Sequence, residues 1–427
     1  MTIEKNIENW RDEYCGSLKD WQEPANQLQS HFADLVGNNW QKTKYIARNL
    51  PFAPEKAIMC PPHSLLNLAP NQQHRTDYAT GCWEGSSAEP ILDENNNITG
   101  ANVILHRQRL ARFVRSLKAR GYNLSMPIEK FGQLILDTVA VHGTETMVTD
   151  DGKPTRAYIR PSAGSGVGSW GVYLTPDHFI ENSVIVFRWG SYFPDVERVA
   201  KEGVRAVIMG SQRMTPIIGK HASNYGDASS DGSLARNLKY DEFIYLAPYG
   251  IRDGEMDANF KDFDDMMRHG VLSDGPGEEI FAILPDGETL IYPPIRVNRL
   301  GGTVLDYITK HLAPSLGLKV REQDITLEDI RSGKIEGLAF AGNAVKVTPV
   351  GRIDIVKPGA TATEGEKVET LFDGGLHPVV AKIRDQFADE LSCKKPPSHE
   401  SLLTPIDLEW GKEFRAHLDD YWKKAGL

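Results

Sequence analysis

The sequence has no uninterrupted apolar run of about 18 residues, the length that crosses a bilayer. Its first residues, MTIEKNIENW, are polar and acidic. We therefore expect neither a membrane span nor a secretion signal. Basic residues are also fewer than acidic ones: 48 Lys and Arg and 58 Asp and Glu give a formal net charge of −10. Because nucleic-acid-binding surfaces concentrate Lys and Arg, this balance argues against nucleic acid as a partner.

Cysteine is scarce and scattered. Cys15, Cys60, Cys82 and Cys393 include no C-x-x-C pair, so the sequence implies neither a disulfide framework nor a zinc knuckle. Cys60 and His63 form a C-x-x-H pair, which is too common to indicate a metal site by itself. We therefore expect a reducing compartment, the cytoplasm, and no bound metal.

Several common catalytic motifs are missing as well. The sequence has no G-x-x-x-x-G-K-[ST], H-E-x-x-H or G-x-S-x-G, which argues against a P-loop nucleotidase, a zincin and an α/β-hydrolase. Gly166, Gly168 and Gly171 do spell G-x-G-x-x-G. Pro176 follows where a dinucleotide-binding fold requires a helix, so we reject that interpretation.

The chain does contain enough material for two domains. Of its 427 residues, 40% are hydrophobic and 25% charged, values typical of globular proteins. Aromatic and apolar residues at rough helical spacing predict an N-terminal helical extension over residues 1–68. We expect a small α/β domain at 69–193, a polar linker at 194–203, a larger domain at 204–395 and a C-terminal extension at 396–427.

Strand and helix patterns both occur along the chain. Runs rich in Val, Ile, Phe and Tyr predict strands at RAYIRPS, SVIVFRW, VRAVIMGS, DEFIYLA and EIFAILPDGETLIYPP. Periodic apolar residues predict helices within VILHRQRLARFVRSLKARGY, PIEKFGQLILDTVAVHG, TVLDYITKHLAPSLG and HPVVAKIRDQFADEL. The acidic stretch DGEMDANFKDFDD, residues 253–265, predicts a surface insertion, with a lid near the site as the less favoured alternative.

Four segments carry the chemistry. They are HRQRLARF (106–113), AYIRPSAGSGVGSWGV (157–172), IIGKHASNYGDAS (217–229) and SDGPGEEIFAI (273–283). Together they resemble the fold-type IV enzymes that use pyridoxal 5′-phosphate (PLP), and among these most closely the branched-chain amino acid aminotransferases. The resemblance implies the α/β fold of D-amino acid aminotransferase-like proteins, with a small N-terminal α/β domain and a larger C-terminal pseudo-barrel domain. It also implies at least a homodimer.

The strongest of these segments is GKHASNYG, in which Lys220 precedes Asn224 and Tyr225. A lysine taken singly is usually solvated. The resemblance makes Lys220 the catalytic residue, because only an amine forms a Schiff base with PLP and later moves the proton. Burial is expected to lower its pKa toward neutrality. Tyr225 is expected to hydrogen-bond the phenolic oxygen of PLP.

The resemblance assigns further PLP contacts. Arg112 is expected to bind the phosphate, since the planar guanidinium suits that group. Backbone N–H groups of Thr303 and Val304, where a helix is predicted to begin, are expected to add to that site. Asp274 is expected to face the pyridine nitrogen and to keep it protonated.

Some positions depart from the pattern of the family. Asp274 stands where glutamate is usual, and Glu279 where asparagine is usual. Val304 stands where a threonine hydroxyl is common. Asn343, after Gly342, replaces a threonine that faces the phosphate; asparagine can still donate a hydrogen bond there, whereas valine cannot.

The resemblance also outlines a substrate pocket. Its expected residues are Tyr78, Trp83, Tyr158, Arg160, Trp170, Val172, Tyr192 and Ala344. Arg160 resembles the arginine with which the family binds the side-chain carboxylate of glutamate. An aromatic residue taken singly is as often ordinary core, but the tyrosines here would both wall the pocket and donate hydrogen bonds.

We therefore expect a PLP-dependent aminotransferase that acts on a branched-chain or related hydrophobic L-amino acid, with 2-oxoglutarate as the acceptor. The expected partners are small amino acids and 2-oxo acids. Two alternatives stay open. D-amino acid transaminase or aminodeoxychorismate lyase-like chemistry keeps the fold and the cofactor. A degenerate PLP-binding protein is the second, and the departures at Asp274, Val304 and Asn343 give it weight.

Overall fold

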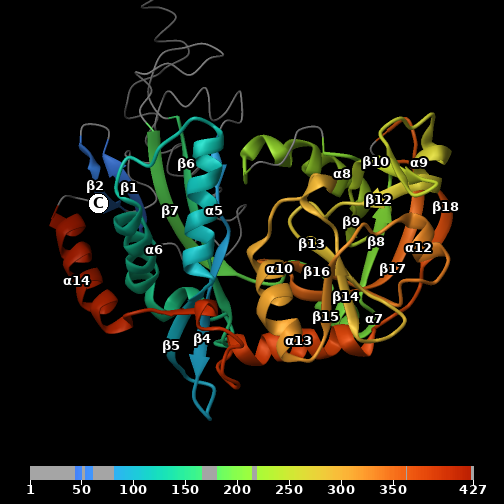
Figure 1. The fold of residues 1–427 in the computed structure, drawn as a ribbon. Helices are drawn as coiled ribbons and strands as arrows, with labels where there is room; N and C mark the ends of the chain where they lie inside the picture. The colour runs from blue at the N-terminus through green and yellow to red at the C-terminus, as the bar shows by residue number, and fades with distance from the viewer. Residues whose placement is uncertain are drawn as a thin grey trace, which may run out of the picture.

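The computed structural model describes six stretches of the chain, residues 44–50, 53–60, 81–165, 180–213, 219–361 and 363–424. These stretches form two lobes, each built on a large sheet, and Figure 1 shows the lobes side by side. Among the described residues, no helix is both long and apolar enough to cross a membrane.

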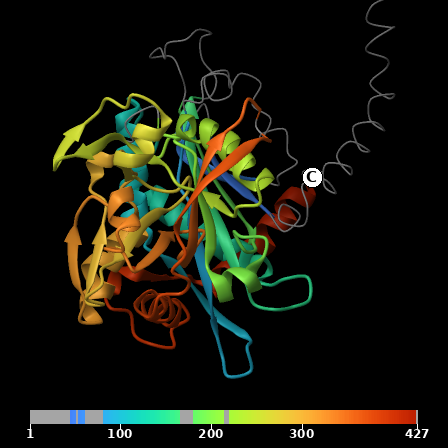
Figure 2. The ribbon, with the colours of Figure 1, turned by 90° about the vertical axis from the view of Figure 1, so that its right-hand side faces the viewer.

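The first lobe contains an eight-stranded sheet in the order β19-β5-β4-β6-β7-β1-β2, with β3 beside β6. Its strands are β1 (Ile46–Leu50), β2 (Ala53–Cys60), β3 (Cys82–Trp83), β4 (Ser86–Leu92), β5 (Ile98–Ile104), β6 (Arg156–Ser165), β7 (Ile180–Trp189) and β19 (Leu403–Pro405). Its helices are α5 (His106–Ala119), α6 (Ile128–His142), η2 (Gly143–Met147) and α14 (Leu408–Lys424). Phe113 of α5 and Phe131 of α6 pack in one core with Ile159 and Val184 of the sheet. In Figures 1 and 2 the β4–β5 hairpin extends beyond the helices at the lower end.

The second lobe contains another eight-stranded sheet, in the order β15-β14-β13-β16-β17-β8-β9 with β18 beside β17, and a small sheet β11-β10-β12. The strands are β8 (Val204–Ile208), β9 (Glu242–Phe243), β10 (Leu246–Arg252), β11 (Glu255–Asp257), β12 (Gly270–Leu272), β13 (Glu279–Ile283), β14 (Thr289–Tyr292), β15 (Lys319–Glu322), β16 (Gly337–Gly342), β17 (Lys346–Pro358) and β18 (Gly365–Phe372). The helices are α7 (Val196–Glu202), η3 (Ala222–Tyr225), α8 (Gly226–Asn237), α9 (Phe263–His269), η4 (Ile295–Val297), α10 (Thr303–Tyr307), η5 (Ile308–Leu312), α11 (Ala313–Ser315), α12 (Leu327–Arg331), α13 (Pro378–Leu391) and η6 (Glu400–Leu402). The predicted mixture of helices and strands is confirmed.

Strand β13 shows why the second sheet is stable between two layers. Ile280 and Ala282 lie in the core that includes residues of β8 and α12, whereas Phe281 and Ile283 lie in the core that includes α10, η5 and α13. Successive side chains of a strand point to opposite faces. A strand buried on both faces therefore has a continuous apolar sequence, as EIFAI does after its first residue.

The helical extension predicted over residues 1–68 is wrong where the structure describes it. Ile46–Leu50 and Ala53–Cys60 form β1 and β2, which pair with each other, and β1 also pairs with β7. Backbone hydrogen bonds to the edge of β7 outweigh a weak helical periodicity. The rest of residues 1–68 lies outside the described residues. The predicted linker contains helix α7, and the domain boundaries themselves stay a prediction.

The acidic stretch 253–265 is part of the second lobe. It supplies β11 and the start of α9, and Asp257 and Asp265 form ion pairs with Arg252. None of its residues lines the cavity in which the sequence-predicted site residues meet, described below. This placement fits the predicted surface insertion better than the predicted lid.

The C-terminal segment returns to the first lobe instead of extending away from the fold. Leu403 of β19 pairs with Ile104 of β5, and α14 packs along α6, as the red helix in Figure 1 shows. Arg415 of α14 forms an ion pair of 2.6 Å with Glu145. The last strand and helix are therefore structural parts of the first lobe.

Gly411 lets α14 pack closely on α6, and we expect Gly411→Ala to destabilise the protein. A Cβ at this position would overlap the carbonyl oxygen of Ala140, so α14 would have to move away. Overpacking of this kind costs about 1–3 kcal/mol, and urea unfolding measures it. A glycine with a positive φ, such as Gly254, is unsuitable as a control, because alanine would be strained there even in open space. Gly190→Ala, where a Cβ would meet nothing within 4 Å, should leave stability nearly unchanged.

Candidate active site

One cavity of about 230 Å³ is lined by every described residue that the sequence analysis assigned to the site. These residues are Trp83, Arg112, Tyr158, Arg160, Tyr192, Lys220, Tyr225, Asp274, Thr303, Val304, Gly342, Asn343 and Ala344. They come from both lobes. Tyr78, Trp170 and Val172 lie outside the described residues. The structure thus brings together segments that are more than 200 residues apart in the sequence.

Lys220 is buried in this cavity, with 6% of its surface exposed. Its Nζ donates to the hydroxyl of Tyr225 at 2.6 Å and lies 4.1 Å from the centre of the Trp83 ring. Burial, followed by the positive charge of Arg112, lowers the pKa of Lys220 to about 7. A lysine with such a pKa is partly neutral at physiological pH, so its amine can act as a nucleophile and exchange protons.

The backbone around Lys220 is fixed by helix α5. The N–H of Lys220 donates to the hydroxyl of Ser116 at 2.9 Å. A Cβ on Gly219 would come within 2.6 Å of the Ser116 Cα, so only glycine permits this approach. The chain therefore places Lys220 directly against the helix that also carries Arg112.

Arg112 forms a buried, bidentate ion pair with Glu84. Its Nε donates to Oε2 at 2.8 Å and its Nη2 to Oε1 at 2.6 Å, and Nη1 donates to the carbonyl oxygen of Gly301 at 3.1 Å. Arginine has five N–H donors, so two remain for a ligand. The opposite charge of Glu84 raises the pKa of Arg112 against the effect of burial.

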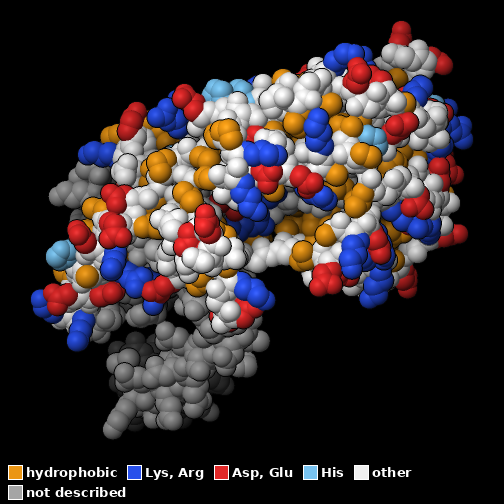
Figure 3. Space-filling view, turned by 90° about the horizontal axis from the view of Figure 1, so that it is seen from below, with side chains coloured by type: hydrophobic (Ala, Val, Ile, Leu, Met, Phe, Trp, Pro, Cys, Tyr) orange, Lys and Arg blue, Asp and Glu red, His pale blue; other side chains and the backbone are white. Residues whose placement is uncertain are grey.

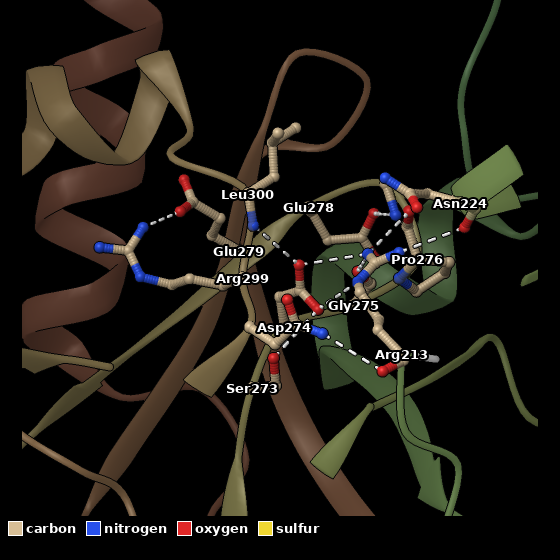
Figure 4. A network of polar contacts seen from close by, with 12 residues as sticks. Arg213, Asn224, Ser273, Asp274, Gly275, Pro276, Glu278, Glu279, Arg299 and Leu300 are labelled. Carbon is tan, nitrogen blue, oxygen red and sulfur yellow. Dashed lines mark hydrogen bonds and ion pairs between the residues drawn. The ribbon is translucent and has the colours of Figure 1, made fainter. Parts of the chain in front are cut away.

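Asp274 forms a buried ion pair with Arg213, as Figure 4 shows. The Arg213 Nε donates to Oδ1 at 3.0 Å and its Nη2 to Oδ2 at 3.1 Å. Arg213 also lies 4.4 Å from the centre of the Tyr245 ring. Burial raises the pKa of Asp274, although Arg213 opposes the rise.

Two further carboxyl groups, Glu278 and Glu242, are buried near Tyr192. The hydroxyl of Tyr192 donates to Glu242 Oε2 at 2.7 Å. Burial raises the pKa of Glu242 to about 6, and burial together with the charge of Glu242 raises that of Glu278 well above its usual value. Two adjacent buried carboxyl groups cannot both ionise easily, so this pair holds at least one proton near neutral pH.

Asn343, in the hairpin turn after β16, lines another side of the cavity. Its Oδ1 accepts from the hydroxyl of Ser87 at 3.2 Å, and the buried Nδ2 has no partner among the described residues. Ser87 also accepts from Lys346 Nζ at 2.7 Å. An unpaired buried amide donor is costly, so this wall is suited to a hydrogen-bond acceptor such as an anion.

The aromatic wall of the cavity surrounds Arg160. The alternation of β6 places Ile159 in the core, so Tyr158 and Arg160 face the other side of the sheet. Arg160 lies 4.0 Å from the centre of the Trp83 ring and donates to the Tyr158 hydroxyl at 2.9 Å. Its Nε and the indole Nε1 of Trp189 are buried without a partner among the described residues.

Among the charged and aromatic side chains that line this cavity, sequence reasoning did not single out Glu84, Trp189, Arg213 and Glu278. Glu278 lies inside SDGPGEEIFAI, close to Asp274, and Trp189 ends SVIVFRW, three residues before Tyr192. Their nearness to predicted site residues could have indicated them. No local sequence pattern marks Glu84 or Arg213. Each can be recognised only through the residue with which it pairs, far away in the sequence.

Comparison with known proteins agrees with this geometry. The family model described as amino-transferase class IV matches residues 94–353, more than half of the chain. No curated protein sequence matches significantly. Among solved structures, the branched-chain amino acid aminotransferase of Escherichia coli is similar, with 22% identity, a TM-score of 0.62 and coverage of 86% of this chain and 99% of that one.

Two further solved structures show the same fold. One is the branched-chain aminotransferase of the archaeon Thermoproteus uzoniensis with norvaline, with 20% identity, a TM-score of 0.61 and coverage of 86% of this chain and 100% of that one. The other is the branched-chain amino acid aminotransferase of Thermobaculum terrenum in its PLP form, with 16% identity, a TM-score of 0.60 and coverage of 86% and 99%. The fold-type IV architecture is confirmed, and the chain belongs to the class IV aminotransferases, a family of PLP-dependent transaminases.

Proposed function

We propose that this transaminase holds PLP on Lys220 and transfers an amino group between a branched-chain or related hydrophobic L-amino acid and 2-oxoglutarate. One observation carries the proposal. A buried lysine with a pKa of about 7 lies in a cavity that has Arg112 and Arg160 among its lining residues. An amine flanked by two anion-binding groups suits a phosphorylated aldehyde and an acidic substrate.

The residues present fit PLP. Arg112 keeps two N–H donors beyond those that it gives to Glu84 and Gly301, and the unpartnered Nδ2 of Asn343 supplies another donor. Thr303 and Val304 line the same cavity. We propose that these groups bind the phosphate, with the Gly342 backbone beside Asn343.

The other residues of the cavity would serve the transfer itself. PLP supplies the electron sink for breaking a bond at the α-carbon of the amino acid. Lys220 then moves the proton through its Nζ, since its amine exchanges protons near neutral pH. Tyr225, 2.6 Å from Nζ, would hydrogen-bond the phenolic oxygen. Asp274 would hold a positive charge at the ring nitrogen.

Substrate choice would depend on the aromatic wall. Trp83, Tyr158, Tyr192 and Ala344 leave an apolar surface for a hydrophobic side chain. Arg160, stacked on Trp83, would bind the second carboxylate of glutamate or 2-oxoglutarate. Figure 3 shows the molecule hollowed between the lobes, with Lys and Arg side chains gathered there. Positive charge in a hollow attracts acidic substrates.

We also propose that the enzyme is a homodimer and works in the cytoplasm. The support for the first is the resemblance of the segment around Trp170 and Val172 to a loop that reaches the neighbouring subunit. The support for the second is that Cys82 and Cys393 are free, as is usual in reducing compartments.

The test is an absorbance spectrum of the PLP-loaded protein before and after each amino donor. We expect L-glutamate and at least one branched-chain L-amino acid to bleach the band of the bound cofactor. Bleaching by D-amino acids only would favour the D-specific alternative, and a colourless protein after incubation with PLP would favour the degenerate one. A response to other L-amino acids alone would keep the reaction and replace the substrate.

Arg160→Leu should separate the two substrates. Because the variant leaves the side-chain carboxylate of glutamate without a partner, we expect kcat/KM for glutamate to fall about 100-fold, or 2–3 kcal/mol. The value for a branched-chain amino acid should change far less. Arg107→Leu, on the exposed side of α5, is the matched control. Equal losses for both substrates in Arg160→Leu would contradict the assignment.

A further inference from the structure

Glu279 occupies a position in the cavity that the proposed transfer does not use. It is the first residue of β13, pairs with Ala341 of β16 and is 3% exposed. Its Oε1 accepts a hydrogen bond from Arg299, as Figure 4 shows. Its Oε2 is buried and has no partner among the described residues. A ligand that reached this oxygen would give it a hydrogen-bond partner.

The unpartnered oxygen lies at the proposed phosphate end. A Cβ on Gly302 would overlap Glu279 Oε2, so the carboxyl group packs directly on the residue that precedes Thr303. Gly301, one residue earlier, accepts from Arg112. Glu279, Gly302, Thr303 and Arg112 line the same cavity. A phosphate bound by Arg112 and Thr303 would thus lie beside this oxygen.

The charges around Glu279 come from three other elements. Arg299, in the segment before α10, favours its ionised form, and so do the backbone N–H of Gly302 and the charge of Arg112, on α5. Asp274, after β12, disfavours that form. Burial has the largest effect, and it raises the pKa of Glu279 to about 7. A phosphate dianion beside the carboxyl group would disfavour ionisation further, since like charges repel.

We propose that Glu279 binds the phosphate of the cofactor as a neutral carboxylic acid, with Oε2 donating its proton to a phosphate oxygen while Oε1 keeps the hydrogen bond from Arg299. The proton comes from the solvent. The proposal rests on the proposed function, because it requires that a phosphorylated cofactor enter this cavity. It gives the unpartnered oxygen a partner and removes the repulsion that a carboxylate would cause.

A measurable consequence is proton uptake. At pH 8 the free protein holds Glu279 mostly ionised, and a phosphate monoester, whose second pKa is about 6, is a dianion. Binding then takes up a proton, and by linkage the affinity falls by up to about tenfold per pH unit above the pKa of the free protein. Glutamine at position 279 keeps a donor but cannot take up a proton.

The experiment is calorimetry of pyridoxamine 5′-phosphate binding to the cofactor-free protein at pH 8, in two buffers of different ionisation enthalpy. We expect the unchanged protein to take up close to one proton more per ligand than Glu279→Gln does. The affinity of Glu279→Gln should vary less between pH 7 and pH 9. Asp306→Asn, which removes an exposed carboxylate from α10, should behave like the unchanged protein.

Lys220 and the paired carboxyl groups of Glu242 and Glu278 are other groups at the cavity that can take up a proton near this pH. Lys220→Ala combined with Glu278→Gln therefore provides a second background, in which uptake of nearly one proton still supports the proposal even if Glu279→Gln does not fold. Equal uptake by the unchanged protein and Glu279→Gln, or none in that double variant, overturns it and leaves the cofactor proposal intact. Failure of every variant and of the unchanged protein to bind pyridoxamine 5′-phosphate overturns both.

Discussion

Lys220→Ala is expected to lower the rate of amino-group transfer by more than about 10³-fold. The variant removes both the amine that holds the cofactor and the group that moves the proton. Neighbouring residues do not replace it, because Tyr225, its hydrogen-bond partner, has a pKa that burial raises far above neutrality. Steady-state kinetics with a saturating amino donor measures the loss.

A labelling experiment shows which lysine is responsible. Reduction of the PLP-loaded protein with borohydride should attach the cofactor to the peptide that contains Lys220. Lys346 is the sharpest internal comparison, because burial lowers its pKa to about 7 as well. It does not line the cavity, however, and its amine is bonded to Glu89 and Ser87. A label on Lys346, or on no lysine, would contradict the proposed function.

Local patterns predicted much of the fold. The periodic apolar residues of HRQRLARFVRSLKA do form α5, and the runs around Tyr158 and Val186 do form β6 and β7. Their signal lies within about 15 residues, the range over which helical and strand periodicities are defined. Strands β1 and β2 were missed because a strand at a sheet edge depends on a distant partner, here β7.

The same distinction applies to the site. Lys220, Arg112 and Asp274 belong to short segments with a recognisable order, and the structure places all three in one cavity. Glu84 and Arg213 are recognisable only through pairing, with Arg112 and Asp274 respectively. Each pair lies within one lobe, where the fold brings together two segments that are distant in the sequence. The number of residues between the two partners is not fixed, so no motif spacing identifies such a pair.

Arg213→Ala should destabilise the folded protein strongly. The ion pair between Arg213 and Asp274 is almost fully buried, and removal of one partner from a buried pair costs about 3–5 kcal/mol because it leaves an uncompensated charge. Urea unfolding of the cofactor-free protein measures this loss. The double variant with Asp274→Asn should regain part of the stability, since a neutral amide needs no counter-charge.

The pH dependence of this loss follows from the direction of the Asp274 pKa. Burial already raises that pKa while Arg213 opposes the rise, so loss of Arg213 raises it further above the unfolded value of about 4. The folded variant then binds more protons than the unfolded chain, and its stability falls as pH rises through that interval. The deficit relative to the unchanged protein should therefore be smaller at pH 5 than at pH 8. A deficit that is the same at both values, or that Asp274→Asn does not reduce, would mean that Arg213 acts through its contacts with Tyr245 and Gly275 and not through the carboxylate.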